Sequence, residues 1–129
     1  MKIDHISIWV QDLEKIRAFY EKYFGAVSNE KYNNPTKSFE SYFLNFDNSC
    51  RLEIMKRPDI KESDHSYTVQ KHGLTHLAFS TGSREKVDEL TETLRRDGYT
   101  VAGEPRVTGD GYYESVILDP ENNIIEITE

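Results

Sequence analysis

The chain has 129 residues, a net charge of −7, 36% hydrophobic residues and 30% charged residues. This length is typical of one globular domain with its own core, and an aromatic content of 12% argues against a disordered chain. The negative charge disfavours nonspecific binding to nucleic acid or to an anionic membrane, so we expect neither as a partner.

The chain has a single cysteine, Cys50, which excludes an internal disulfide bond. The first residues contain no apolar run of the kind found in signal peptides. No segment reaches the roughly 20 consecutive apolar residues of a membrane-spanning helix. We therefore expect a soluble, cytoplasmic protein.

The first half of the chain has the pattern of one strand, one helix and three further strands. β-branched residues over 3–10 predict a strand. Asp12 is a predicted helix N-cap, apolar residues follow at helical spacing up to Phe24, and Gly25 is a typical C-terminal stop. Three strands are then predicted, at 26–32, 38–46 and 50–56.

The second half repeats this order after a polar connector. Residues 58–72 show no sustained period, and a strand is predicted over 74–80. Ser83 is a predicted cap of a second helix that ends at 97–98, and three strands follow at 99–107, 112–118 and 123–128. We therefore predict a single α+β domain over 1–129, in which two βαβββ modules (1–57 and 73–129, with connector 58–72) form a cupped, mixed eight-stranded sheet with its helices outside.

Two pairs of similar segments support this internal repeat. Residues 4–8 resemble 75–79, and residues 52–54 resemble 125–127. Each segment carries one polar residue between apolar neighbours: His5, His76, Glu53 and Glu126. Because alternate side chains of a strand point to opposite faces, each polar side chain points away from the apolar side chains expected to pack under the helices.

These four residues form a candidate metal site if the two modules close side by side. Two imidazoles and two carboxylates suit Zn²⁺, Ni²⁺, Mn²⁺ or Fe²⁺, and the sequence leaves the identity of the metal open. A single His or Glu within a strand is more often solvent-facing than metal-binding. Four at equivalent points of a repeat favour a site for one divalent metal ion.

The residues around this candidate site resemble the vicinal oxygen chelate superfamily, and specifically its small glyoxalase I-like proteins. The resemblance covers essentially the whole chain. Its motifs are the opening strand from His5 to Leu13 with the later Phe24-Gly25, the segment 73–79, and the ending 119–126. This ending resembles Asp-Pro-x-Gly-x-x-x-Glu with Asn122 in place of glycine, and asparagine tolerates a left-handed turn better than most residues.

The resemblance implies that His5, Glu53, His76 and Glu126 are the metal ligands. Fosfomycin-modifying and ring-cleaving dioxygenase relatives use two His and one Glu, and bleomycin-binding relatives lack the metal. The ligand set thus implies a glyoxalase I-like lyase or isomerase that acts on a hemithioacetal or another small vicinal-oxygen substrate through an enediolate. Glu126 is then the catalytic base, Glu53 shares that role, and the chain forms a homodimer.

Other functions stay open at this point. A non-enzymatic protein of the bleomycin-resistance type would bind a drug or metabolite with the same fold. A fosfomycin-modifying enzyme, a dioxygenase or a metal-dependent epimerase would share much of the site and differ in the pocket walls.

The residues expected around the substrate depart from those of the glutathione-using enzymes. Those enzymes carry Arg four residues after the first His and Asn four residues after the first Glu, where this chain has Trp9 and Arg57. The thiol cofactor is therefore open. Trp9, Tyr42, Arg57 and Tyr113 are candidate substrate-binding residues, although aromatic residues on strands more often serve packing and arginines more often lie in solvent.

Overall fold

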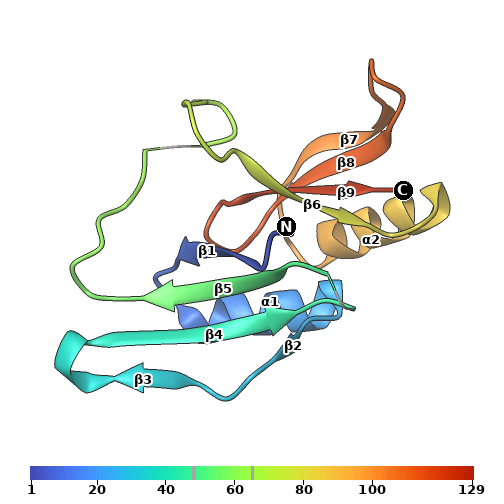
Figure 1. The fold of residues 1–129 in the computed structure, drawn as a ribbon. Helices are drawn as coiled ribbons and strands as arrows, with labels where there is room; N and C mark the ends of the chain where they lie inside the picture. Colours follow the sequence, from blue (N-terminus) through green and yellow to red (C-terminus); the bar gives the residue numbers. More distant parts are fainter. Residues whose placement is uncertain (48, 65) are drawn as a thin grey trace. The chain divides into compact units, whose positions relative to one another are not determined.

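The computed structural model describes residues 1–47, 49–64 and 66–129 (Figure 1). The chain divides into two compact units, unit 1 over Met1–Glu62 and unit 2 over Ser63–Glu129. The boundary falls inside the predicted connector. Within the described residues, neither helix is long and apolar enough to cross a membrane.

Unit 1 consists of one helix on a five-stranded sheet. Its elements are β1 (His5–Trp9), α1 (Leu13–Phe24), β2 (Val27–Ser28), β3 (Tyr32–Asn34), a single 3-10 turn η1 (Pro35–Lys37), β4 (Phe39–Asn45) and β5 (Arg51–Lys56). The strand order is β1-β5-β4-β2, and β3 also pairs with β4. Among the described strands of unit 1, the β1–β5 pair is parallel and the remaining pairs are antiparallel.

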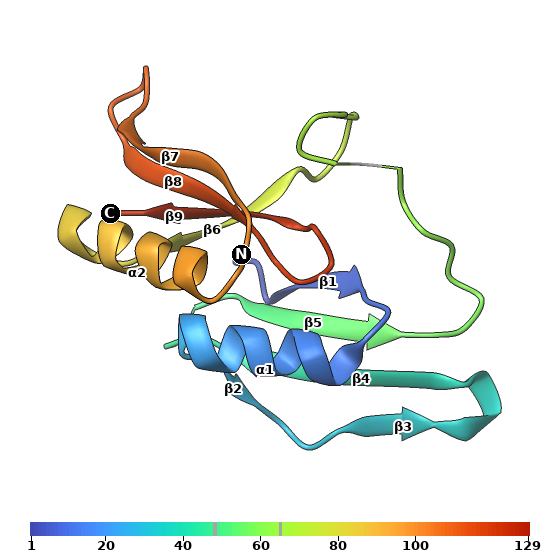
Figure 2. The same cartoon turned by 180° about the vertical axis from the view of Figure 1, so that it is seen from behind.

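Helix α1 is bounded as the sequence predicts. The Asp12 carboxylate accepts a hydrogen bond from the backbone N–H of Lys15 at 3.0 Å, which caps the first turn. Gly25 ends the helix with a φ of 65°, a left-handed conformation that costs glycine little. The buried side of α1 packs on β4 and β5 (Figure 2) and supplies the main core of unit 1: Leu13, Ile16, Tyr20, Leu44, Leu52 and Ile54.

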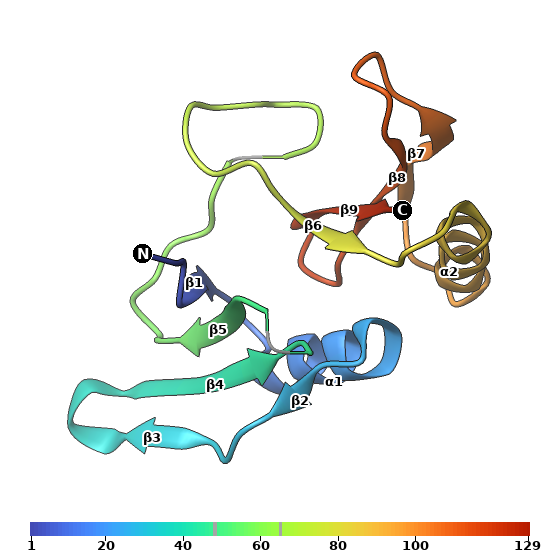
Figure 3. The same cartoon turned by 45° about the vertical axis from the view of Figure 1, so that its right-hand side comes forward.

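Unit 2 consists of one helix on a four-stranded sheet. Its elements are β6 (His76–Ser80), α2 (Arg84–Arg96), β7 (Val101–Val107), β8 (Tyr113–Leu118) and β9 (Ile124–Thr128). The strand order is β6-β9-β8-β7, with β6 parallel to β9 (Figure 3). Helix α2 packs on β7, β8 and β9 and is capped by Ser83, whose hydroxyl accepts from the Lys86 N–H.

The α+β class and the two modules are confirmed, and one detail differs. The two sheets have five and four strands, because the segment predicted as one strand over 26–32 forms the two short strands β2 and β3. Between them the Asn29 side chain accepts a hydrogen bond from the Phe43 N–H at 2.8 Å. The Asn29 N–H still donates to the Phe43 carbonyl at 3.1 Å, so one backbone bond remains at this position and the side chain takes the place of the other. Asn122 has a φ of 66°, as its place in the turn before β9 requires.

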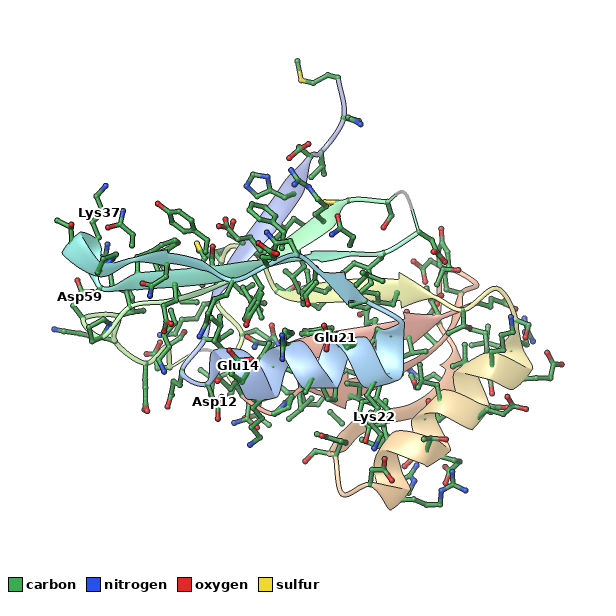
Figure 4. All side chains as sticks on the ribbon, turned by 90° about the horizontal axis from the view of Figure 1, so that it is seen from below. Asp12, Glu14, Glu21, Lys22, Lys37 and Asp59 are labelled. Atoms are coloured by element: carbon green, nitrogen blue, oxygen red, sulfur yellow. The ribbon has the colours of Figure 1, made fainter. Side chains whose placement is uncertain are left out.

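A polar network fastens α1 to β4 on the helix-covered side of unit 1. The Tyr42 hydroxyl donates to Glu14 at 3.0 Å, and Lys31 pairs with both Glu14 and Glu40 at 3.1 and 2.9 Å. Figure 4 shows Glu14 in the first turn of α1. Burial raises the pKa of Glu14, but hydrogen bonds from Lys31 and Tyr42 outweigh it, so this pKa lies below its ordinary value of 4.5.

The lowered pKa predicts an acid-sensitive contribution to stability. A carboxyl group with a folded-state pKa below 4.5 stabilises the fold above that pH and loses the contribution as pH falls through the folded-state value. Because Glu14 is half exposed, we expect Glu14→Gln to lower the free energy of unfolding by only about 1 kcal/mol at neutral pH. Urea unfolding at several pH values should show this difference shrinking as pH falls well below 4.5.

The matched control is Glu30→Gln, which removes the same charge from an exposed loop residue of unit 1. It should change stability little at any of these pH values. A Glu14→Gln deficit that stays constant down to strongly acidic pH would contradict this account of the network.

Candidate metal-binding pairs

In unit 1 the strand register places His5 and Glu53 on the same side of the sheet. Ser7 pairs with Glu53 and Ile6 pairs with Leu52, so His5, Ser7 and Glu53 face away from the apolar residues under α1. We call the side of each sheet that no helix of its own unit covers the open face. On the open face of unit 1, His5 Nε2 lies 4.0 Å from Glu53 Oε2.

Unit 2 repeats this arrangement. Ala78 pairs with Glu126 and Leu77 pairs with Ile125, so His76 and Glu126 share the open face of that sheet. His76 Nε2 lies 3.2 Å from Glu126 Oε2. The same ring nitrogen meets the same type of carboxylate oxygen in both units.

The residue before each histidine fixes its ring. The Asp4 carboxylate lies 2.9 Å from His5 Nδ1, and the Thr75 hydroxyl lies 3.0 Å from His76 Nδ1. With Nδ1 held in this way, Nε2 is the nitrogen left to present its lone pair to a cation. Arg51 in turn pairs with Asp4. Asp4 and Thr75 were not predicted from the sequence, although their place directly before the two histidines was visible in it.

The two carboxylates differ in how they are held. The Ser7 hydroxyl donates to Glu53 Oε2 at 3.0 Å and restrains that carboxylate. Ala78 occupies the corresponding position beside Glu126 and has no hydroxyl to donate. The Glu126 carboxylate therefore lacks the restraint that Glu53 has from its neighbouring strand.

The donors in each pair fit a divalent transition metal. Each histidine side chain is 39% exposed, and the glutamate side chains are less exposed than that. An imidazole nitrogen and a carboxylate oxygen are ligands of the kind that Zn²⁺, Ni²⁺, Mn²⁺ and Fe²⁺ accept. Over residues 1–47, 49–64 and 66–129, no group of three or more His, Cys, Asp or Glu side chains forms that could hold a metal ion. Each unit thus supplies one pair of candidate ligands.

Two of the candidate substrate-binding residues lie on the open face of unit 1. Trp9 is on the same side of β1 as His5, is 41% exposed, and meets Phe39 edge-on at 6.1 Å between ring centroids. The Arg57 guanidinium lies over the Trp9 ring at 5.4 Å. Arg57 also lines a shallow hollow of about 420 Å³ with Lys37 and Asp59.

The other two candidate residues lie on the helix-covered sides. Tyr42 pairs with Ile54, is 6% exposed and bonds to Glu14 of α1, so the structure does not bring it to Glu53. The Tyr113 hydroxyl donates to Asp88 of α2 at 2.8 Å, so this side chain points away from Glu126. Alternation along β4 and β8 explains both cases, because neighbouring positions in a strand face opposite sides.

A further carboxyl group, which sequence reasoning missed, lies on the open face of unit 2. Glu114 and Val116 share one side of β8, and Val116 pairs with Glu126. Burial raises the pKa of Glu114, the Glu126 charge raises it further, and Arg106 opposes the rise. No motif marks Glu114, because its setting depends on cross-strand neighbours.

Comparisons with known proteins show relatives of similar sequence and fold. Over 97% of its length the chain is similar to the fosfomycin resistance protein FosX of Listeria monocytogenes, with 31% identity and 86% of that protein covered. It is 28% identical to the uncharacterized protein YqjT of Bacillus subtilis over 95% of this chain and 94% of that one. The solved structure of a glyoxalase family protein from Enterococcus faecalis is similar with a TM-score of 0.80 and 25% identity, covering 99% of this chain and 97% of that one.

The family itself follows from a match along nearly the whole chain. The sequence profile of the glyoxalase/bleomycin resistance protein/dioxygenase superfamily matches residues 2–127. These residues span both units up to the penultimate residue of β9 and contain both His–Glu pairs. The chain belongs to the glyoxalase/bleomycin resistance protein/dioxygenase superfamily.

Proposed function

We propose that this protein is a glyoxalase I-like lyase or isomerase that depends on a divalent metal. Its substrate would be a hemithioacetal or another small molecule with two neighbouring oxygens. The observation that carries the proposal is the matched pair of sites, with an imidazole Nε2 facing a glutamate oxygen at equivalent places in both units. A protein that only binds a small molecule has no need of two such pairs.

In this proposal His5, Glu53, His76 and Glu126 hold one metal ion. The proposal applies whether one chain or two chains of a homodimer supply the pairs, because each pair is complete within its own unit. The bound metal would supply Lewis acidity towards the two substrate oxygens. Asp4 and Thr75 keep the two imidazoles oriented, a role that neighbours of metal ligands commonly have.

Glu126 is the better candidate for the group that moves the proton. Its carboxylate would take the proton from the substrate carbon next to the carbonyl group and return it to the neighbouring carbon, leaving the substrate isomerised without net loss of atoms. A carboxylate that serves two neighbouring carbons in turn benefits from freedom to move. The Ser7 hydroxyl restrains Glu53, whereas Ala78 offers no such bond to Glu126.

Modification of fosfomycin is the second candidate function, favoured by the similarity to FosX. Glu53 argues for the first function, since the resemblance implies that fosfomycin-modifying relatives lack a glutamate at this position. The two functions also differ in substrate charge and type of reaction, so activity assays separate them.

The metal part of the proposal is tested by histidine substitution. Protein purified without added metal should contain close to one divalent ion for each four-ligand set, measured by elemental analysis. His76→Ala should weaken metal binding by about 100-fold or more, since it removes one of the four ligands. His72→Ala is the matched control, because it removes an exposed histidine of unit 2 that faces no glutamate in the described structure. Equal loss of metal in both variants would contradict the assignment of His76.

The catalytic part is tested with methylglyoxal hemithioacetals made from several thiols. On a thiol that supports turnover, Glu126→Gln should lower kcat by about 10²- to 10⁴-fold, because the neutral amide cannot accept the proton. Glu53→Gln should lower kcat less than Glu126→Gln. Metal content is measured on the same samples, so that lost metal is not mistaken for lost base. Full turnover of metal-loaded Glu126→Gln would show that another group moves the proton.

A further inference from the structure

An ion pair lies on the open face of unit 2 beside the His76–Glu126 pair. Arg106 of β7 pairs in register with Glu114 of β8, and Arg106 Nη2 lies 3.6 Å from Glu114 Oε1. The Glu114 side chain is only 14% exposed, whereas the Arg106 side chain is 54% exposed. The carboxylate is therefore enclosed, and the guanidinium remains accessible to a ligand.

A glycine lies beside this guanidinium. Gly103 pairs with Val116, and a Cβ atom added to Gly103 would lie 3.5 Å from Arg106 Nη1 and 3.2 Å from Val116 Cβ. The register of β7 shifts between Gly103 and Arg106. Gly103 thus lies close to both the Arg106 guanidinium and Val116, the residue that pairs with Glu126, and its missing side chain avoids a tight contact with Val116.

The charges of this group oppose a strongly anionic ligand. Arg106, Glu114 and Glu126 carry charges of +1, −1 and −1 before any metal ion is bound, and the Arg106 guanidinium already faces the Glu114 carboxylate. At separations of a few ångströms near a protein surface, one unit charge changes a binding constant by about tenfold or more. The Glu114 carboxylate therefore weakens the binding of each additional negative charge that a ligand brings to Arg106.

We propose that Glu114 is a specificity-determining residue that occupies Arg106 and so selects substrates with at most one negative charge over doubly charged phosphates and phosphonates. The inference deepens the proposed function by naming the charge class of its substrate. It rests on that function only in placing the substrate on the open face of unit 2. A binding measurement without turnover tests it separately.

The test compares two flat aromatic probes that differ mainly in charge. Phenyl phosphate is doubly charged at about pH 8, and benzenesulfonate is singly charged. Their dissociation constants are measured by calorimetry on the purified full chain with its metal content held constant. Relative to wild type, Glu114→Gln should tighten phenyl phosphate binding by about tenfold or more while changing benzenesulfonate binding less.

Two further variants make the result specific to the Arg106–Glu114 pair. Glu104→Gln causes the same change in net charge in β7, but Glu104 pairs with Arg95 of α2 at 2.6 Å, so the preference between probes should stay at the wild-type value. Adding Arg106→Gln to Glu114→Gln should abolish the gain. Glu114→Ala serves as a second variant if Glu114→Gln folds poorly by circular dichroism. A gain that survives loss of Arg106, or an equal gain in Glu104→Gln, would overturn the proposal.

Discussion

The arrangement of both candidate pairs depends on the register of two parallel strand pairs, β1 with β5 and β6 with β9. Because side chains alternate along a strand, a shift of one residue would turn a histidine or a glutamate to the helix-covered side. The apolar side chains of the same strands oppose such a shift. Ile54 and Ile125 are fully buried beneath their helices, and a slip would expose them to water. Packing of the core thus fixes the direction in which the polar residues point.

Core packing fixes the strand register in each unit separately, yet the residues around the two His–Glu pairs differ. In unit 1 a serine beside the glutamate and an aspartate beside the histidine hold both members of the pair. In unit 2 a threonine holds the histidine, and alanine stands where the serine would be. A duplicated architecture with unequal neighbours is suited to giving two glutamates different roles, one as a fixed ligand and one as a group that moves a proton.

The surroundings of the pairs differ in charge as well. The open face of unit 1 carries Trp9 with Arg57 over its ring, while that of unit 2 carries the partly enclosed Arg106–Glu114 pair. Members of one family can share a set of metal ligands and differ in their substrates, since binding residues on the same fold set specificity. For this chain, the side chains beside the ligands are therefore more informative about the substrate than the ligands are.

The sequence alone determined the α+β class, the two modules and the helix caps. It also determined which polar residues alternate with buried apolar residues along the strands. These features follow from periodicity and local hydrogen bonding. Asp12, Gly25 and Asn122 have the roles that their residue types predict. Only the tertiary structure decided which aromatic residues reach the open faces: Tyr42 and Tyr113 bond to the helices instead. It also revealed the Arg106–Glu114 pair beside Glu126. These features depend on cross-strand neighbours, which leave no periodic signal in the sequence.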